Sequence, residues 1–148
     1  MFLDQYEYFA KNNFLTYQFT SKGKNGAIEK IVQYSKLTIP GVGIVYNLGF
    51  GDLTSDGRIN DIVNSNNGDM EKVLSTVANT IYDFIAHYPN QFIFAYGSTP
   101  IRTKLYQQKI SQMLQIISTE FEVYGLEKAG WVEFTGTEEY KAFLIKKK

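Results

Sequence analysis

The apolar residues between Met70 and Pro89 recur at three- and four-residue steps, and this pattern constrains the fold more than any other part of the chain. The residues of this stripe are Met70, Val73, Leu74, Val77, Ile81, Phe84, Ile85 and Tyr88. Such spacing places them on one face of a helix, and Pro89 ends the helix because proline has no backbone N–H to donate. The sequence therefore predicts an amphipathic helix that must cover an apolar surface built by the rest of the chain.

Segments with strand character precede and follow this helix. Residues 13–21 alternate between apolar and polar side chains, and the Lys-Gly-Lys-Asn-Gly run at 22–26 is typical of a hairpin turn, because Asn and Gly accept positive φ. Residues 27–37 would return as the second strand of that hairpin. The other expected strands are residues 44–50, 91–96, 121–125, 131–134 and 142–145.

A second helix is predicted to begin at Pro100, since proline is favoured at the first helical position. Its apolar stripe includes Leu105, Ile110, Met113, Leu114 and Ile117. Thr137, followed by two glutamates, could begin a short further helix. The expected order is strand, strand, strand, helix, strand, helix, strand, strand. It describes a single α+β domain over residues 1–148, with a mainly antiparallel sheet and two main helices.

The composition gives no support to several classes of function. Fifteen Lys and Arg residues balance fifteen Asp and Glu residues, so no whole-molecule charge draws the chain to nucleic acid or a membrane surface. The absence of cysteine removes disulfides, thiolate zinc sites and cysteine nucleophiles. Residues 1–13 lack the pattern of a signal peptide, and no segment approaches the ~20 apolar residues of a membrane span. We expect a soluble cytoplasmic protein, and the sequence predicts no nucleic-acid or membrane partner.

Two polar junctions that contain glycine stand directly before the predicted helices, Asn-Asn-Gly-Asp at 66–69 and Gly-Ser-Thr-Pro-Ile-Arg at 97–102. The first turn of a helix carries unpaired N–H groups and the positive end of the helix dipole, so such junctions can hold anions. The first junction also fits a plain N-cap, and Asp69 would repel an anion there. The second is the better candidate, because Arg102 is one of only two arginines in the chain and Lys104 lies nearby to add positive charge. Ser98 or Thr99 can cap the helix that begins there.

Two residues of the second helix have competing interpretations. Arg102 would pair an anion, or it would form a surface ion pair with Asp52 or Asp61. Tyr106 lies four residues later on the same side of the helix and is a weak candidate for a general acid, while half-buried packing is the simpler role. The residues predicted to form a polar ligand site between the two helix starts are Asp52, Asn66, Asn67, Asp69, Ser98, Thr99, Arg102 and Tyr106.

The run from Asp52 to Asn60 resembles the start of a calcium-binding loop, with oxygen-bearing side chains at alternating positions and a glycine. Its twelfth position is Val63, where a carboxylate is needed, so we expect an ordinary Asp-Gly turn and no bound metal. His87, the only histidine, falls at the end of the first helix with no visible partner for catalysis.

Four motifs together resemble an uncharacterised family of small bacterial proteins of about this length. They are Tyr-Asn-Leu-Gly-Phe-Gly-Asp at 46–52, Asn-Asn-Gly-Asp at 66–69, Val-Leu-Ser-Thr-Val-Ala at 73–78 and Gly-Ser-Thr-Pro-Ile-Arg-Thr-Lys-Leu-Tyr at 97–106. The resemblance spans most of the chain and implies a domain of unknown function, without an activity.

The order of elements is also similar to the later two-thirds of a GNAT-type acyltransferase. This second resemblance implies that residues 64–70 would hold the pyrophosphate of an acyl coenzyme A. Tyr106 would then be the candidate general acid.

Three functions are therefore carried forward. The leading hypothesis is a binding module without a cofactor, which holds a small anionic ligand or an acidic group of a protein partner between the two helix starts. The first alternative is an acyltransferase that uses acetyl coenzyme A. The second is an interaction protein that forms a homodimer through exposed aromatic residues such as Tyr6, Tyr8 and Phe9.

Overall fold

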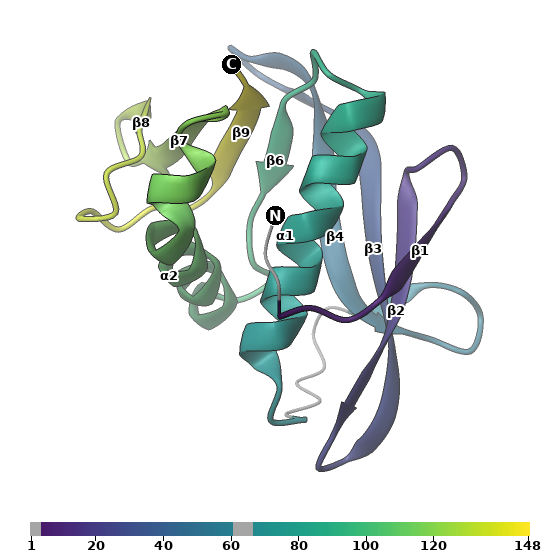
Figure 1. Cartoon of the computed structure of the whole chain (residues 1–148). Helices are drawn as coiled ribbons and strands as arrows, with labels where there is room; N and C mark the ends of the chain where they lie inside the picture. Colours follow the sequence, from purple (N-terminus) through teal and green to yellow (C-terminus); the bar gives the residue numbers. More distant parts are fainter. Residues whose placement is uncertain (1–3, 61–66) are drawn as a thin grey trace. The chain divides into compact units, whose positions relative to one another are not determined.

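The structure is a computed structural model of the chain, and it describes residues 4–60 and 67–148. The chain divides into two compact units, one made of Met1–Ser35 and Gly49–Pro89, the other of Lys36–Leu48 and Asn90–Lys148. Each unit combines strands with one long helix (Figure 1). The α+β class and the mainly antiparallel pairing are confirmed, while the single domain stays a prediction. Neither described helix is long and apolar enough to cross a bilayer.

The first unit is built on antiparallel strands. β1 (Tyr8–Lys11) pairs with β2 (Thr16–Gly23), and β2 pairs along its whole length with β3 (Gly26–Ile39). The turn between β2 and β3 is the one predicted, with Gly26 at a φ of +87°. The part of β4 (Gly43–Leu53) in this unit forms a hairpin with the short β5 (Ile59–Asn60).

Helix α1 (Met70–His87) covers one face of these strands and confirms the predicted helix. The ring of Tyr34 on β3 stacks on Phe84 of α1 with centroids 4.2 Å apart, and the Tyr34 and Thr80 hydroxyls are hydrogen bonded at 2.8 Å. Phe84 is fully buried, which contributes roughly 2–3 kcal/mol by removal of its apolar surface from water. The buried apolar residues of α1 are Val73, Leu74, Val77, Ala78, Phe84 and Ile85.

A second, polar face of α1 is also buried, which the amphipathic pattern did not predict. The backbone N–H of Tyr6 donates to Thr76 Oγ1 at 2.9 Å, and the Tyr8 hydroxyl donates to the Asp83 carboxylate. The N-terminal segment therefore lies along this face of the helix. Tyr6 and Tyr8 are half-buried, so the expectation that both are exposed aromatics is wrong; Phe9, 54% exposed, fits it.

The second unit contains the remaining parts of β3 and β4 and four further strands. β6 (Ile93–Ala95) runs parallel to β4, and β9 (Phe143–Lys147) lies between β6 and β7 (Phe121–Glu127), antiparallel to both. β8 (Gly130–Glu133) pairs with β7, and α2 (Pro100–Ile117) begins at the predicted proline. The apolar side chains buried in this unit include Ile93, Ile110, Met113, Ile117, Phe121, Val123, Phe143 and Leu144.

Three local expectations are corrected. The first predicted strand begins at Thr16 rather than Asn13, because Asn12, Asn13 and Phe14 all have positive φ and form the turn after β1, a strand that was not predicted. β5 was not predicted either. Residues 136–138 form bends, and the helix expected to begin at Thr137 does not form. The Glu138 carbonyl accepts from the Gln107 side chain and the Thr137 N–H donates to the Thr135 hydroxyl, so these backbone groups are paired outside a helix.

Candidate functional site

The junction between β6 and α2 explains the Gly-Ser-Thr-Pro-Ile-Arg-Thr sequence. A Cβ on Gly97 would lie 2.3 Å from the backbone nitrogen of Thr103, so only glycine lets the chain pass this close to the first helical turn. The Thr103 hydroxyl accepts from the Gly97 N–H at 3.0 Å. Thr99 is the N-cap, and its hydroxyl accepts from the Arg102 N–H at 3.2 Å, as the capping prediction required.

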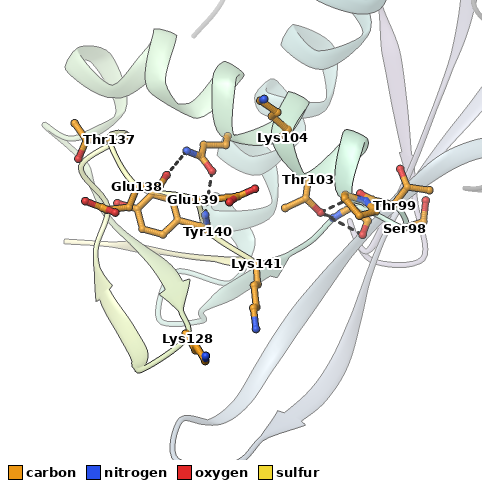
Figure 2. Close-up of a pocket in the computed structure, with 14 residues that line it drawn as sticks. Ser98, Thr99, Thr103, Lys104, Lys128, Thr137, Glu138, Glu139, Tyr140 and Lys141 are labelled. Atoms are coloured by element: carbon orange, nitrogen blue, oxygen red, sulfur yellow. Dashed lines mark hydrogen bonds between the residues drawn. The ribbon is translucent and has the colours of Figure 1, made fainter.

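A pocket of about 990 Å³ opens beside this junction, within the second unit. The start of α2 lines it with residues 97–100, Thr103, Lys104 and Gln107, and the remaining lining comes from Lys128 and residues 136–141. In the view of Figure 2, Ser98 and Thr99 lie on one side, Glu138 and Tyr140 lie on the other, and Lys141 lies between them. Pockets of this size accept ligands as large as a nucleotide or a drug molecule.

The wall opposite α2 is held in place by hydrogen bonds. Gln107 Nε2 donates to the Glu138 carbonyl at 2.6 Å, and Gln107 Oε1 accepts from the Tyr140 N–H at 3.3 Å (Figure 2). The Tyr140 ring is buried over Gly125, where a Cβ would lie 2.3 Å from the ring. The Tyr140 hydroxyl accepts from the Thr135 N–H at 3.0 Å. Hydrogen bonds to Gln107 and to Thr135 therefore hold the loop that contains Glu138 and Tyr140 in place.

Three lysines and two glutamates give the pocket its charge. Lys104, Lys128 and Lys141 are all exposed, and in the described part of the chain none of them forms an ion pair. The first turn of α2 contains no acidic residue that would cancel the positive end of its dipole. Glu138 and Glu139 lower the local potential from the opposite wall. The balance is one net positive charge plus the helix terminus, which favours an anion near the start of α2.

The predicted residues of α2 divide between two faces of the helix. Ser98 and Thr99 line the pocket, whereas Arg102 and Tyr106 are part-buried and do not belong to its lining. Positions four apart share a face, so Thr103 and Gln107 reach the pocket while the Arg102 and Tyr106 pair lies on a neighbouring face. The roles predicted for Arg102 and Tyr106 stay predictions.

Lys128 and Lys141 were missed because they come from distant loops. Lys128 lies in the turn between β7 and β8, and the backbone N–H of Lys141 donates to the Leu126 carbonyl at 2.8 Å, which fixes it beside β7. The insertion of β9 next to β7 brings both lysines to the pocket. No local pattern in the sequence indicates that pairing.

The other predicted site residues belong to the first unit and make structural contacts there. Asp52 forms an ion pair with Lys30, whose side chain is 8% exposed. Asn67 is buried, and its side chain accepts from the Asn25 N–H at 2.6 Å and donates to the Ser21 hydroxyl and the Gly26 carbonyl, each at 3.0 Å. Asn67 therefore fastens the start of α1 to the turn between β2 and β3.

Asp69 occupies the N-cap position of α1 but makes no side-chain cap, which corrects that interpretation of the first junction. Its carboxylate instead accepts from the Tyr6 and Ser21 hydroxyls, each at 2.5 Å, because these donors lie beside it. Burial raises the pKa of Tyr6 above its ordinary value, and the hydrogen bond to the Asp69 carboxylate raises it further. Asn66 and residues 64–66 of the segment expected to hold a coenzyme pyrophosphate lie outside the described residues. A site shared between the two helix starts stays a prediction.

The run at 52–60 contains the expected Asp-Gly turn. The Gly57 N–H donates to the Thr54 carbonyl at 3.0 Å, and Gly57 has a φ of +84°. Across residues 4–60 and 67–148, no three His, Asp or Glu side chains are grouped so as to hold a metal ion.

Comparisons with known proteins identify a family without an assigned activity. Searches of curated proteins and of solved structures gave no significant match. A family model described as a family of unknown function (DUF6934) matches residues 3–148.

Proposed function

We propose that this chain, which belongs to the family of unknown function DUF6934, binds a small anionic ligand in the pocket at the start of α2. The ligand would carry a phosphate or carboxylate group. The observation that supports this most directly is a cavity of about 990 Å³ lined by three lysines that form no ion pair with any residue the structure describes.

Each lining group has a role in this proposal. The ammonium groups of Lys104, Lys128 and Lys141 attract the anion, and the exposed Ser98 hydroxyl is a hydrogen-bond donor beside it. Thr99 fixes the helix start through its cap and can still donate its own hydroxyl proton. Gln107 holds the opposite wall at a constant distance from α2.

The expected affinity for a bare anion is modest. An exposed ion pair contributes about 0.2–1 kcal/mol, and a helix terminus contributes about 0.3–1 kcal/mol. Three lysines and one terminus therefore provide roughly 1–4 kcal/mol, which corresponds to dissociation constants of about 1 mM or weaker. The natural ligand gains the rest of its affinity from the remaining volume of the pocket.

The two glutamates restrict the kind of ligand. A molecule that is anionic throughout would face Glu138 and Glu139 on the opposite wall, which is unfavourable. A ligand with an anionic group at one end and hydroxyl or amine donors at the other satisfies both walls.

Calorimetric titration with pyrophosphate tests the proposal. Lys141→Gln and Lys104→Gln should each weaken binding about threefold to fivefold, while the matched control Lys147→Gln, on the exposed end of β9 and outside the pocket, should leave it unchanged. Glu139→Gln should strengthen binding. Equal affinity in all four variants would reject the pocket as the anion site.

A thermal melt with acetyl coenzyme A tests the acyltransferase alternative. Acetyl coenzyme A carries a pyrophosphate and would stabilise the native protein in a thermal melt if it were the ligand. Arg102→Gln and Tyr106→Phe then test the two α2 residues predicted from the sequence, because neither belongs to the pocket lining. Loss of binding in Arg102→Gln alone would favour the sequence-based site over the pocket.

A further inference from the structure

The outer edge of β1 is an open strand edge. β1 stands at the end of the strand order, and among the described residues it pairs with β2 alone. Figure 1 shows β1 beside β2, with no further strand beyond it in the first unit. An open edge presents unpaired N–H and C=O groups that can pair with another strand.

The side chains of this segment alternate between the two faces of the strand. Tyr6 and Tyr8 point inward, where their hydroxyls donate to carboxylates of Asp69 and Asp83. Glu7, which directly precedes β1, is exposed, and so are Phe9 and Lys11 within the strand; Phe9 is 54% exposed although it is a large aromatic residue. The outward face therefore presents an acid, an aromatic ring and a base at alternating positions.

This outward face is complementary to itself. If two copies of the strand pair antiparallel with the twofold axis at Phe9, each residue faces the one at the mirrored position about Phe9. Glu7 then faces the partner subunit's Lys11, and Lys11 faces the partner subunit's Glu7. The two Phe9 rings face each other on the axis. Opposite charges and aromatic pairs directly across two antiparallel strands are stabilising.

We propose that β1 is the docking edge for a second copy of this chain, which forms a symmetric dimer by antiparallel pairing of the two β1 strands. The occupant is identified by charge complementarity, because opposite charges directly across two antiparallel strands attract. Here the acid and the base are placed at equal distances from Phe9, which matches the same sequence running in the opposite direction.

The dimer should be weak. β1 has four residues, so the paired surface is far below the roughly 1,200 Å² of a stable interface. A dissociation constant between about 10 µM and 1 mM is expected, with association that weakens as salt increases. No residue that lines the pocket at α2 belongs to β1, so this inference and the proposed function are tested by different variants and can fail independently.

Charge reversal gives a sharp test by sedimentation velocity at low salt, with protein concentrations up to about 1 mM. Glu7→Lys replaces two attractive pairs with two repulsive pairs, and so does Lys11→Glu. Each variant alone should dimerise at least tenfold more weakly than the wild type. An equimolar mixture of the two variants should recover wild-type association, because both pairs are then oppositely charged.

The controls separate this interface from a general charge effect. Glu120→Lys makes the same change in net charge as Glu7→Lys, at an exposed position outside β1, and should leave dimerisation unchanged. Both reversed residues are exposed, so circular dichroism should show the native fold in each variant. A wild type that stays monomeric at 1 mM, or a mixture that associates no better than its components, would overturn the proposal.

Discussion

Asn67→Ala is the most informative single change in the first unit, because Asn67 was predicted to bind ligand and the structure gives it another role. Its side chain is 4% exposed and makes three hydrogen bonds, to the Asn25 N–H, the Ser21 hydroxyl and the Gly26 carbonyl. Its backbone carbonyl accepts from the Lys24 N–H at 3.2 Å. The substitution removes the three side-chain bonds and leaves the backbone bond in place.

The size of the effect follows from those bonds. Each contributes about 1 kcal/mol, and their loss in a buried site leaves the former partners poorly satisfied, so the free energy of unfolding should fall by roughly 3 kcal/mol. For a chain of this size, the midpoint of thermal unfolding should drop by roughly 10 °C. The backbones of Gly23 and Asn67 are already in close contact, because a Cβ added to Gly23 would lie 1.9 Å from the Asn67 carbonyl oxygen. The backbone therefore cannot move closer to fill the space that the Asn67 side chain leaves.

Urea denaturation and a thermal melt measure the change. Asn90→Ala is the matched control, because Asn90 is exposed and does not take part in this network. Pyrophosphate affinity should be unchanged in Asn67→Ala, since the pocket lies in the second unit. A variant with wild-type stability and lost pyrophosphate binding would refute the structural role and restore the ligand role.

Two further predictions concern the pocket wall and the buried tyrosines. Gln107→Leu removes both hydrogen bonds that hold the loop at 138–140, so the free energy of unfolding should fall by about 1–2 kcal/mol. The dissociation constant for pyrophosphate, measured by calorimetry, should rise severalfold. Unchanged affinity would show that this loop does not shape the pocket. Burial raises the pKa of Tyr17 and of Tyr34 above that of an unfolded tyrosine. The contribution of each tyrosine to the free energy of unfolding is therefore fully present below about pH 10. As the pH rises from there toward the folded-state pKa, this contribution falls by roughly 1.4 kcal/mol per pH unit for each residue. Tyr17→Phe should reduce this slope in urea melts between pH 9 and about 11 at little cost near pH 7, because the Tyr17 hydroxyl has no hydrogen-bond partner among the described residues; an unchanged slope would contradict the assignment.

The parts of the fold that were predictable are those set by local pattern. The period of α1 and the turn at 22–26 depend on neighbours within a few residues, and Thr99 caps α2 for the same reason. The position of β9 between β6 and β7 depends on long-range pairing that carries no local signal.

The candidate site divides in the same way. Ser98 and Thr99 were found because a capping sequence is local, whereas Lys128 and Lys141 reach the pocket through the pairing of β7 with β9. Tyr6 was taken as a surface aromatic because its acidic partner lies 63 residues away along the chain. From the sequence alone, polar residues that hydrogen bond to distant parts of the chain cannot be distinguished from polar residues that bind a ligand.

The central claim is that the pocket at the start of α2 holds an anion, and a residue-resolved NMR titration with pyrophosphate tests it most directly. The account predicts that backbone amide shifts change at residues 97–107, at Lys128 and along residues 136–141, with no change at the turn held by Asn67. Shifts that appear around Asn67 and Asp69 instead, or no saturable shifts at all, would contradict it.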